Sequence, residues 1–316
     1  MMTKRHRVCF LGTPDFADSH LQALLQNPDY QVVGVVTQPD RPAGRKMQLT
    51  PSPVKKTALE KSLPVLTPEK LRNEPEAMQK IFSWQADVAV VVAFGQILPQ
   101  EFLDGFSYGA VNVHGSLLPQ WRGAAPIQRA LEAGDRLSGV TLQRVVKKLD
   151  AGPVIGKREI ILDDVINATE LYGKLALLGQ ELLQQDLLKY LNGQLIPQEQ
   201  DESLVSIAKK IEKSEGQLSW QLSAREFHNR VRAFTMGPGT FIPYKGQRMK
   251  IHRTAVVSES GSGVPSSILL AESDKLHVQT AQGALALLEL QPESKNKINV
   301  RDFLKSNPLR KGDLFV

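Results

Sequence analysis

The sequence predicts the α/β fold class, with a mainly parallel sheet domain followed by a smaller β-barrel domain. Two observations predict it. Up to about residue 193, short apolar runs alternate with helical patterns, as they do in βαβ units. After about residue 211, short strand-like runs are separated by glycine-containing turns. We therefore expect a Rossmann-like first domain and an OB-like second domain.

The strands of the first domain are expected at short apolar runs. The run Asp87–Ala93 does not alternate between apolar and polar residues, which predicts a central strand covered on both faces. The residues directly after it would then lie at the rim of a ligand crevice. The strands expected before the first long helix are Arg7–Leu11, Gln31–Thr37, Asp87–Ala93, Ala110–His114 and Gly139–Val146.

A returning strand and a long helix are expected next. Pro153–Leu162 has the pattern of a strand, and Asn167–Glu170 has the polar cap and following glutamate of a helix start. Leucines recur at helical spacing as far as Tyr190, and Asn192-Gly193 is a typical helix end. The apolar stripe of this helix would complete the first domain.

These elements predict three parts of the chain: a first domain at 1–193, a linker at 194–210 and a second domain at 211–316. The linker is polar, contains a proline and shows no periodicity. In the second domain we expect one helix around Ala224–Phe234. The strands that follow it would be separated by turns such as Gly237-Pro238-Gly239 and Tyr244-Lys245-Gly246.

The composition is that of a globular, cytoplasmic protein. Of the 316 residues, 41% are hydrophobic and 23% are charged, and no apolar run approaches the roughly 20 residues that span a bilayer. The single cysteine, Cys9, lies in an apolar run, so no disulfide within the chain is expected. The six histidines show no paired ligand spacing, and we expect no metal site.

The net charge of +6 is unevenly distributed. Residues 213–316 hold 15 Lys and Arg against 9 Asp and Glu, whereas the preceding residues sum to zero. A local basic surplus suits a module that binds a polyanion, because each cation can displace a counterion from a phosphate backbone. Scattered surface charge that keeps a domain soluble explains the surplus equally well.

The first βα turn argues against a nicotinamide-dependent oxidoreductase. A dinucleotide-binding turn needs three glycines, and only Gly12 is present. Pro14 also removes an amide donor where a phosphate would need one.

The densest group of polar residues lies around Asn112 and His114. On a strand at Ala110–His114 these two side chains share one face near the carboxyl end, where open α/β sheets bind ligands. An amide and an imidazole directed at one point could stabilise an oxyanion that develops on a carbonyl carbon. Asp150 lies in a tight turn between two apolar runs, and from the pattern alone it could equally be a turn-capping residue.

Four segments together resemble the methionyl-tRNA formyltransferases of the folate-dependent formyltransferase superfamily. They are FLGTPDFA at 10–17, TQPDRPAGRKMQLTPSPVK at 37–55, NVHGSLLPQWRGAAPIQRA at 112–130 and LDAGP at 149–153. The resemblance implies formyl transfer from 10-formyltetrahydrofolate to the α-amino group of methionine on initiator methionyl-tRNA, with tetrahydrofolate released. It also implies that Asn112, His114 and Asp150 are the catalytic residues.

The resemblance implies two further sets of residues. Those bordering the folate would be Phe94, Gly95, Gln96, Ile97, Leu98, Ser116, Leu117, Leu118 and Pro119. Those contacting tRNA would be Arg41, Arg45 and Lys46 in the 37–55 loop, and Arg230, Arg232, Lys245, Arg248, Lys250 and Arg253 in the second domain. The turn at 232–239 lacks the tryptophan common in this family, which affects its packing and not the chemistry.

Two alternatives remain open from the residues. A formyltransferase of the same superfamily that acts on a small amine, such as a sugar nucleotide, would have a different second domain. A non-catalytic RNA-binding protein would leave Asn112, His114 and Asp150 without a role. For the enzyme that acts on tRNA we expect a monomer that does not bind membranes.

Overall fold

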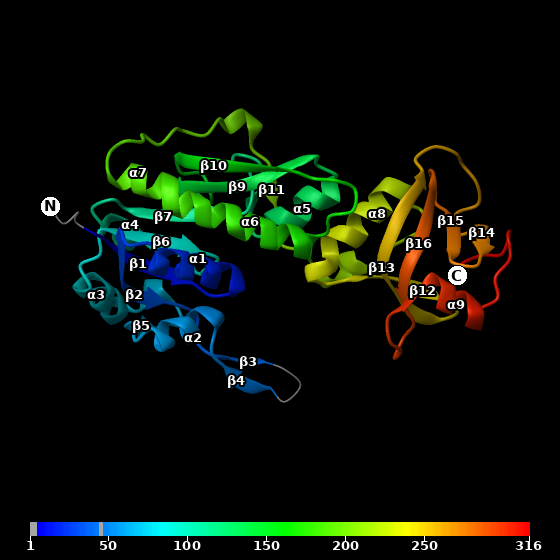
Figure 1. Ribbon diagram of the computed structural model, residues 1–316, viewed down its shortest axis with the longest axis horizontal. Coiled ribbons are helices and arrows are strands. Elements are labelled where there is room, and N and C mark those ends of the chain that lie inside the picture. The colour runs from blue at the N-terminus through cyan, green and yellow to red at the C-terminus, as the bar shows by residue number, and fades with distance from the viewer. Residues whose placement is uncertain (1–4, 44–46) are drawn as a thin grey trace. The chain divides into compact units, whose positions relative to one another are not determined.

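Parallel strands dominate the first part of the computed structural model, which describes residues 5–43 and 47–316 (Figure 1). The seven-stranded sheet has the order β10-β9-β7-β6-β1-β2-β5. Strands β1, β2, β5, β6 and β7 are parallel, and β9 runs antiparallel to β7. The sheet strands are β1 (His6–Gly12), β2 (Tyr30–Val36), β5 (Val65–Leu66), β6 (Val88–Val92), β7 (Ala110–His114), β9 (Leu137–Arg144) and β10 (Val154–Ile161).

The strand order reverses between β1 and β6, because β2 and β5 follow on one side of β1 and β7 follows on the other side of β6. In open α/β sheets, a ligand crevice forms at the carboxyl ends of the strands at such a reversal. Gly12 ends β1 at this point, where a Cβ atom would collide with Ala17 of the following helix. The sheet therefore places its ligand-binding edge beside Gly12 and the residues after β6.

Helices cover both faces of this sheet, as the uninterrupted apolar run of β6 predicts. All five residues of β6 are buried. One face packs against α3 (Pro75–Ser83) and α4 (Gln100–Asp104) through a core that includes Trp84 and Phe102. On the other face lie α1 (Asp15–Gln26) and α6 (Ala168–Leu182), where Gly179 lies against His20 and Val113.

The long helix expected from Asn167 is confirmed, with one irregular turn. Asn167 accepts hydrogen bonds from the Thr169 and Glu170 amides, and Glu170 accepts one from the Asn167 amide. This capping box starts α6, and the helical path continues through a π-helical turn at Leu183–Leu187 into α7 (Leu188–Leu191). The remaining short elements of this part of the chain are β3 (Arg41–Ala43), β4 (Gln48–Thr50), α2 (Pro53–Glu60), a 3₁₀ turn at Leu71–Asn73, and β8 (Arg122–Gly123).

A separate antiparallel sheet forms in the second part, with the order β12-β13-β16-β15-β14 and with β17 paired to β16. Its core contains Trp220, Phe227, Phe303 and Phe315. The elements of this part are α5 (Pro126–Ala133), α8 (Ala224–Ala233), β12 (Thr240–Tyr244), β13 (Gln247–Ser258), β14 (Ile268–Glu272), β15 (Lys275–Gln279), β16 (Ala284–Gln291), β17 (Ile298–Asn299), α9 (Val300–Ser306), and 3₁₀ turns at Lys213–Gly216 and Phe234–Met236. The 3₁₀ turn at Glu202–Leu204 belongs to the first part, and β11 (Ile207–Ala208) lies where the chain passes into the second. The prediction of a mainly parallel sheet followed by a strand-rich domain is confirmed.

The chain divides into two compact units whose limits are not simple cuts in the sequence. The first comprises residues 1–123, 139–160 and 172–207, and the second comprises residues 124–138, 161–171 and 208–316. Helix α5 belongs to the second unit, where Arg129 bonds Glu215. The domain limits 1–193 and 211–316 stay a prediction. Within the described residues, no helix is both long and apolar enough to cross a bilayer.

Candidate active site

Asn112 and His114 lie at the carboxyl end of β7, where two neighbouring strands fix their positions. In the parallel pairing with β6, Val91 lies opposite Asn112. In the antiparallel pairing with β9, Gln143 lies opposite Asn112 and Thr141 lies opposite His114. Because the side-chain period of a strand is two, all four polar side chains project from the same face of the sheet.

His114 is buried and has oxygen atoms on both sides of its ring. Its Nε2 atom donates a hydrogen bond to the Trp121 carbonyl at 2.9 Å, because a carbonyl can only accept. Its Nδ1 atom lies 3.8 Å from Asp150 Oδ2, within ion-pair range. With the Nε2 proton held by Trp121, Nδ1 is the ring nitrogen that can gain and lose a proton.

Asp150 is held in an unusual backbone conformation by three hydrogen bonds. Its φ of 47° lies in the left-handed region, which is uncommon for a residue other than glycine. Its Oδ2 accepts from the Gly123 amide at 2.9 Å, its Oδ1 accepts from Gln143 at 3.2 Å and its carbonyl accepts from Gln200 at 2.9 Å. Hydrogen bonds from β8 and β9 therefore hold the carboxylate beside His114.

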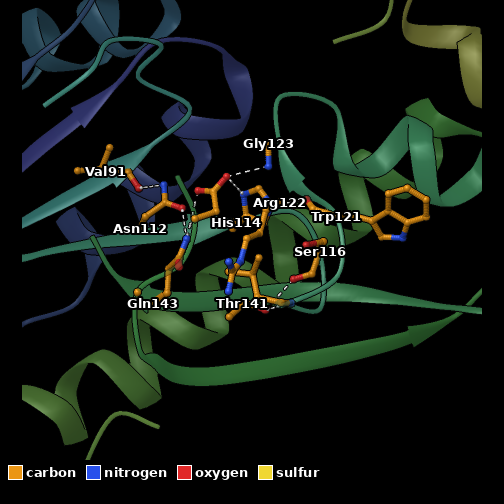
Figure 2. Close-up of polar contacts among 12 residues, drawn as sticks. Val91, Asn112, His114, Ser116, Trp121, Arg122, Gly123, Thr141 and Gln143 are labelled. Carbon is orange, nitrogen blue, oxygen red and sulfur yellow. Dashed lines mark hydrogen bonds and ion pairs between the residues drawn. The ribbon is translucent and has the colours of Figure 1, made fainter. Parts of the chain in front are cut away.

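The amide of Asn112 has one donor position available for a ligand. Its Nδ2 atom donates to the Val91 carbonyl at 3.0 Å, and its Oδ1 atom accepts from Gln143 at 3.5 Å (Figure 2). Among the described residues Val91 is the one acceptor bonded to this NH₂ group, which carries two hydrogens. The structure thus brings together Asn112, His114 and Asp150 at one edge of the sheet.

Four residues of this cluster were not identified from the sequence: Arg122, Gln143, Gln200 and Glu202. Polar Thr141 and Gln143 alternate with apolar Val140 and Leu142 in β9, a signal that could have placed Gln143 beside Asn112 if the pairing of β7 with β9 had been known. Gln200 and Glu202 lie in the stretch interpreted as a linker, and nothing in its pattern indicates that it returns to the sheet. Hydrogen bonds from Arg122 and then from Lys148 lower the pKa of Glu202 to about 2.

The residues expected to border the folate fall into two groups. Phe94 is buried, and its carbonyl accepts from Gln38 at 3.0 Å. The Gln96 side chain bonds the Leu71 amide and the Pro68 carbonyl, and Ile97 is exposed. A hollow of about 260 Å³ opens here, and it is lined by Gln38, Glu69, Lys70, Leu71, Arg72, Gly95, Gln96 and Ile97.

The second group forms the turn after His114. Ser116 is buried, and its hydroxyl donates to the Gln120 carbonyl at 2.6 Å. Thr141 donates to the Ser116 carbonyl and accepts from the Leu118 amide, so β9 holds this turn as well. Lys157 donates to the Leu118 carbonyl, and burial lowers the pKa of its ammonium group. Leu117 and Pro119 are partly exposed.

The expected RNA-contacting residues differ in exposure. Arg45 and Lys46 lie outside the described residues. Arg41, the first residue of β3, is exposed and pairs with Glu69. On the antiparallel sheet Lys245, Arg248, Lys250 and Arg253 are exposed, with Arg248 stacked on Phe241 at 3.9 Å. Arg230 is partly exposed and pairs with Glu132.

Arg232 is the exception, because it is buried. Its guanidinium donates to the Asp163 carbonyl at 3.0 Å and to Asn229 at 3.1 Å, and burial lowers its pKa. In this arrangement it anchors a loop of the second unit. Across the described parts of the chain, no group of three or more His, Cys, Asp or Glu side chains is arranged to hold a metal ion.

Comparison with known proteins identifies relatives along the whole chain. Residues 6–187 match the family model described as formyl transferase, and residues 210–308 match that of the formyl transferase C-terminal domain. A curated protein of Bdellovibrio bacteriovorus named methionyl-tRNA formyltransferase is 55% identical over 310 residues, which cover 97% of this chain and 98% of that protein.

Solved structures with the same fold are more distant in sequence. An N-formyltransferase from Helicobacter canadensis, solved with folinic acid and dTDP-3-aminofucose, has a TM-score of 0.66 at 17% identity, covering 91% of this chain and 99% of that one. HypX from Aquifex aeolicus, solved with tetrahydrofolic acid, has a TM-score of 0.61 at 16% identity and covers 99% of this chain. This chain spans about half the length of HypX, 51%. At these identities the similarity shows the fold alone.

Proposed function

The chain belongs to the formyl transferase family, and we propose that it transfers the formyl group of 10-formyltetrahydrofolate to the α-amino group of methionine on initiator methionyl-tRNA. The product is N-formylmethionyl-tRNA for translation initiation, and tetrahydrofolate is released. The observation that carries this proposal is the 55% identity to a methionyl-tRNA formyltransferase over nearly the full length of both chains. Asn112, His114 and Asp150 also lie together at one sheet edge. Their side chains are of the types that can stabilise an oxyanion and transfer a proton, as this reaction requires.

The bond-forming step requires stabilisation of negative charge on the formyl oxygen. The amine nitrogen attacks the formyl carbon, a C–N bond forms and the carbonyl π electrons move to oxygen. Asn112 Nδ2 and protonated His114 are the groups that stabilise this oxyanion, and their fixed positions reduce the reorganisation needed during the reaction. No covalent enzyme intermediate is needed, because the nucleophile belongs to the substrate.

The second step breaks the bond between the formyl carbon and N10 of the folate. The electrons of that bond move to N10, and the proton lost by the amine is delivered there. His114 Nδ1 and the Asp150 carboxylate, 3.8 Å apart, are the pair that handles this proton. Asp150 also orients the imidazole and stabilises its charged form.

The folate lies, in this proposal, along the carboxyl ends of β6 and β7. Phe94, Gly95, Gln96, Ile97 and Leu98 border the pterin, and Ser116, Leu117, Leu118 and Pro119 border the reacting end. The hollow beside Gly95 and Gln96 combines apolar and polar lining groups, as a flat heteroaromatic ring requires. Because the Gln96 side chain already bonds residues 68 and 71 and the Phe94 carbonyl accepts from Gln38, we assign recognition of the pterin to the backbone groups of residues 95–98.

The RNA contacts of the proposal are cations of the 37–55 segment and exposed cations of the antiparallel sheet. Arg41, Arg45 and Lys46 belong to the first set, and Arg230, Lys245, Arg248, Lys250 and Arg253 belong to the second. We give Arg232 a structural role beneath the second set, because its guanidinium is bonded within the protein. We retain the domain limits 1–193 and 211–316, a monomeric enzyme and a cytoplasmic location as parts of the same proposal.

An acceptor comparison tests this function. The purified protein is supplied with 10-formyltetrahydrofolate and with initiator methionyl-tRNA, free methionine or an amino sugar nucleotide. We expect formyl transfer to methionyl-tRNA and none above background to the two small amines. Transfer to a small amine alone would refute the RNA substrate, and the absence of transfer to any acceptor would refute the reaction.

A further inference from the structure

A buried row of side-chain amides connects Arg122 to Asn112 across the first unit. On the basis of the proposed function, we propose that Arg122, Gln200 and Gln143 are positioning residues that fix which end of the Asn112 amide faces the reaction centre. The oxyanion can be stabilised only if Asn112 presents its NH₂ group and not its oxygen. Because an amide is nearly symmetric in shape, its surroundings must enforce that orientation.

Arg122 determines which end of each amide in this row donates and which accepts, because a guanidinium only donates hydrogen bonds. Its Nε and Nη2 atoms both bond Gln200 Oε1, at 3.1 and 2.8 Å. Gln200 must therefore accept at this end. Arg122 is 2% exposed, and Glu202, which also pairs with Lys148, balances its buried charge at 2.9 Å.

The NH₂ end of Gln200 then faces acceptors only. Its Nε2 atom lies 3.2 Å from Gln143 Oε1, 2.9 Å from the Asp150 carbonyl and 2.7 Å from the Gly152 carbonyl. A reversed Gln200 would place its oxygen against these three oxygens and its NH₂ group against the guanidinium. Leaving several buried polar groups unpaired is strongly unfavourable, so the reversed state is excluded.

The orientation of Gln200 in turn fixes which end of the Gln143 amide faces the catalytic residues. With its Oε1 bonded by Gln200, its Nε2 atom donates to Asp150 Oδ1 at 3.2 Å and to Asn112 Oδ1 at 3.5 Å (Figure 2). Gln143 is buried, which strengthens the preference. At its other end Asn112 donates to the Val91 carbonyl, so both neighbours require the NH₂ group on the side away from Gln143.

The test uses changes that keep side-chain size and alter hydrogen bonding. Gln143→Met removes the donor to Asn112 and Asp150, and Gln200→Glu keeps the acceptor for Arg122 but removes the donor to Gln143. We expect kcat for methionyl-tRNA formylation to fall about 10- to 100-fold in both, with KM for both substrates within about twofold of the unmodified protein. Gln185→Met is the matched control, because Gln185 also accepts from an arginine, Arg158, outside the site. It should leave kcat unchanged.

A double-mutant comparison separates this role from general support of the fold. In the Asn112→Ala background, Gln143→Met should lower kcat by a clearly smaller factor than in the unmodified protein, because only its bond to Asp150 is then left to lose. The same full loss in both backgrounds would overturn the inference, as would kcat within twofold of normal in either single variant. If Gln143→Met does not fold, Gln200→Glu alone decides, assayed below its own melting temperature, which should fall because a carboxylate oxygen then faces the Asp150 and Gly152 carbonyls. Failure of the unmodified protein to formylate any acceptor would instead count against the proposed function.

Discussion

At the scale of single residues, Asp150 shows how the fold brings a turn aspartate to His114 in the candidate site. Its position in the left-handed region is supported by bonds from Gly123, Gln143 and Gln200, which come from three separate stretches of the chain. Strain of this kind persists only where the surroundings enforce it. The sequence pattern could not distinguish this role from turn capping, because all three partners are distant along the chain.

Replacing Asp150 by asparagine tests that role. Both carboxylate oxygens accept from N–H donors, so an asparagine would place its own NH₂ group against one of them. We expect kcat for formyl transfer to fall by at least about 100-fold. Asp104→Asn on α4, where the carboxylate bonds only the exposed Gln100 among the described residues, should retain normal kcat. Near-normal turnover of Asp150→Asn would contradict the proton-handling role.

His20 gives a pH prediction for stability. It is buried, its Nδ1 bonds the Phe16 carbonyl, and burial lowers its pKa to about 4. In the unfolded chain its pKa is near 6.5, so the unfolded state binds the extra proton first as the pH falls. Stability should decrease between pH 6.5 and 4, by on the order of 3 kcal/mol from this group. In melting experiments across this range His20→Leu should lose less stability than the unmodified protein, and equal losses would refute the effect.

At the scale of elements, the loop from Asp150 to Gly152 depends on close approach between backbone segments. A Cβ atom at Gly152 would overlap the Arg144 carbonyl at the end of β9. Gly152→Ala should therefore displace Asp150 and lower kcat about 10- to 100-fold. Gly173→Ala on α6 is the control, because among the described residues no atom beyond the adjoining part of its own helix lies within 4 Å of the added methyl group, and it should stabilise the helix by about 0.5–1 kcal/mol. Equal activity of the two variants would show that the loop tolerates displacement.

The elements also show how far the sequence alone can be interpreted. Periodicity predicted the strand Ala110–His114 and the long helix after Asn167, because both depend on local patterns. It did not predict that Pro126–Ala133 packs in the second unit, or that Gln198–Ser206 returns to β10 and Arg122. Those contacts are made by polar backbone and side-chain groups with no repeating pattern. The candidate site was therefore predicted at Asn112 and His114 and missed at Gln143 and Gln200.

At the scale of the whole molecule, the net positive charge of residues 213–316 is the feature that suits an RNA substrate. Arg248 and Lys250 alternate with buried Met249 and Ile251 on β13, which places the two cations on the outer face of the sheet. Cations on such a face contribute salt-dependent affinity and little sequence recognition. Arg232 is buried, and its guanidinium bonds Asp163 and Asn229. It therefore stabilises the fold of this domain instead of contacting RNA.

The dependence of tRNA affinity on salt concentration distinguishes the exposed cations from buried Arg232. Arg248→Ala and Lys250→Ala should each weaken tRNA binding and reduce the slope of log affinity against log salt by about one. Lys189→Ala, an exposed change on α7, should leave the slope unchanged. Arg232→Met should lower the melting temperature instead, because it removes two buried hydrogen bonds. A slope unaffected by either surface change would place the RNA contacts elsewhere.

The central claim is that Asn112, His114 and Asp150 act together on the formyl group, and single-turnover kinetics test it most directly. Enzyme in excess is mixed with methionyl initiator tRNA and saturating 10-formyltetrahydrofolate, so that product release does not contribute to the rate. We predict that Asn112→Ala, His114→Ala and Asp150→Ala each slow the chemical step at least about 100-fold, while the triple variant is little slower than the slowest single one. Chemical rates within a few-fold of normal in the three single variants would contradict the claim.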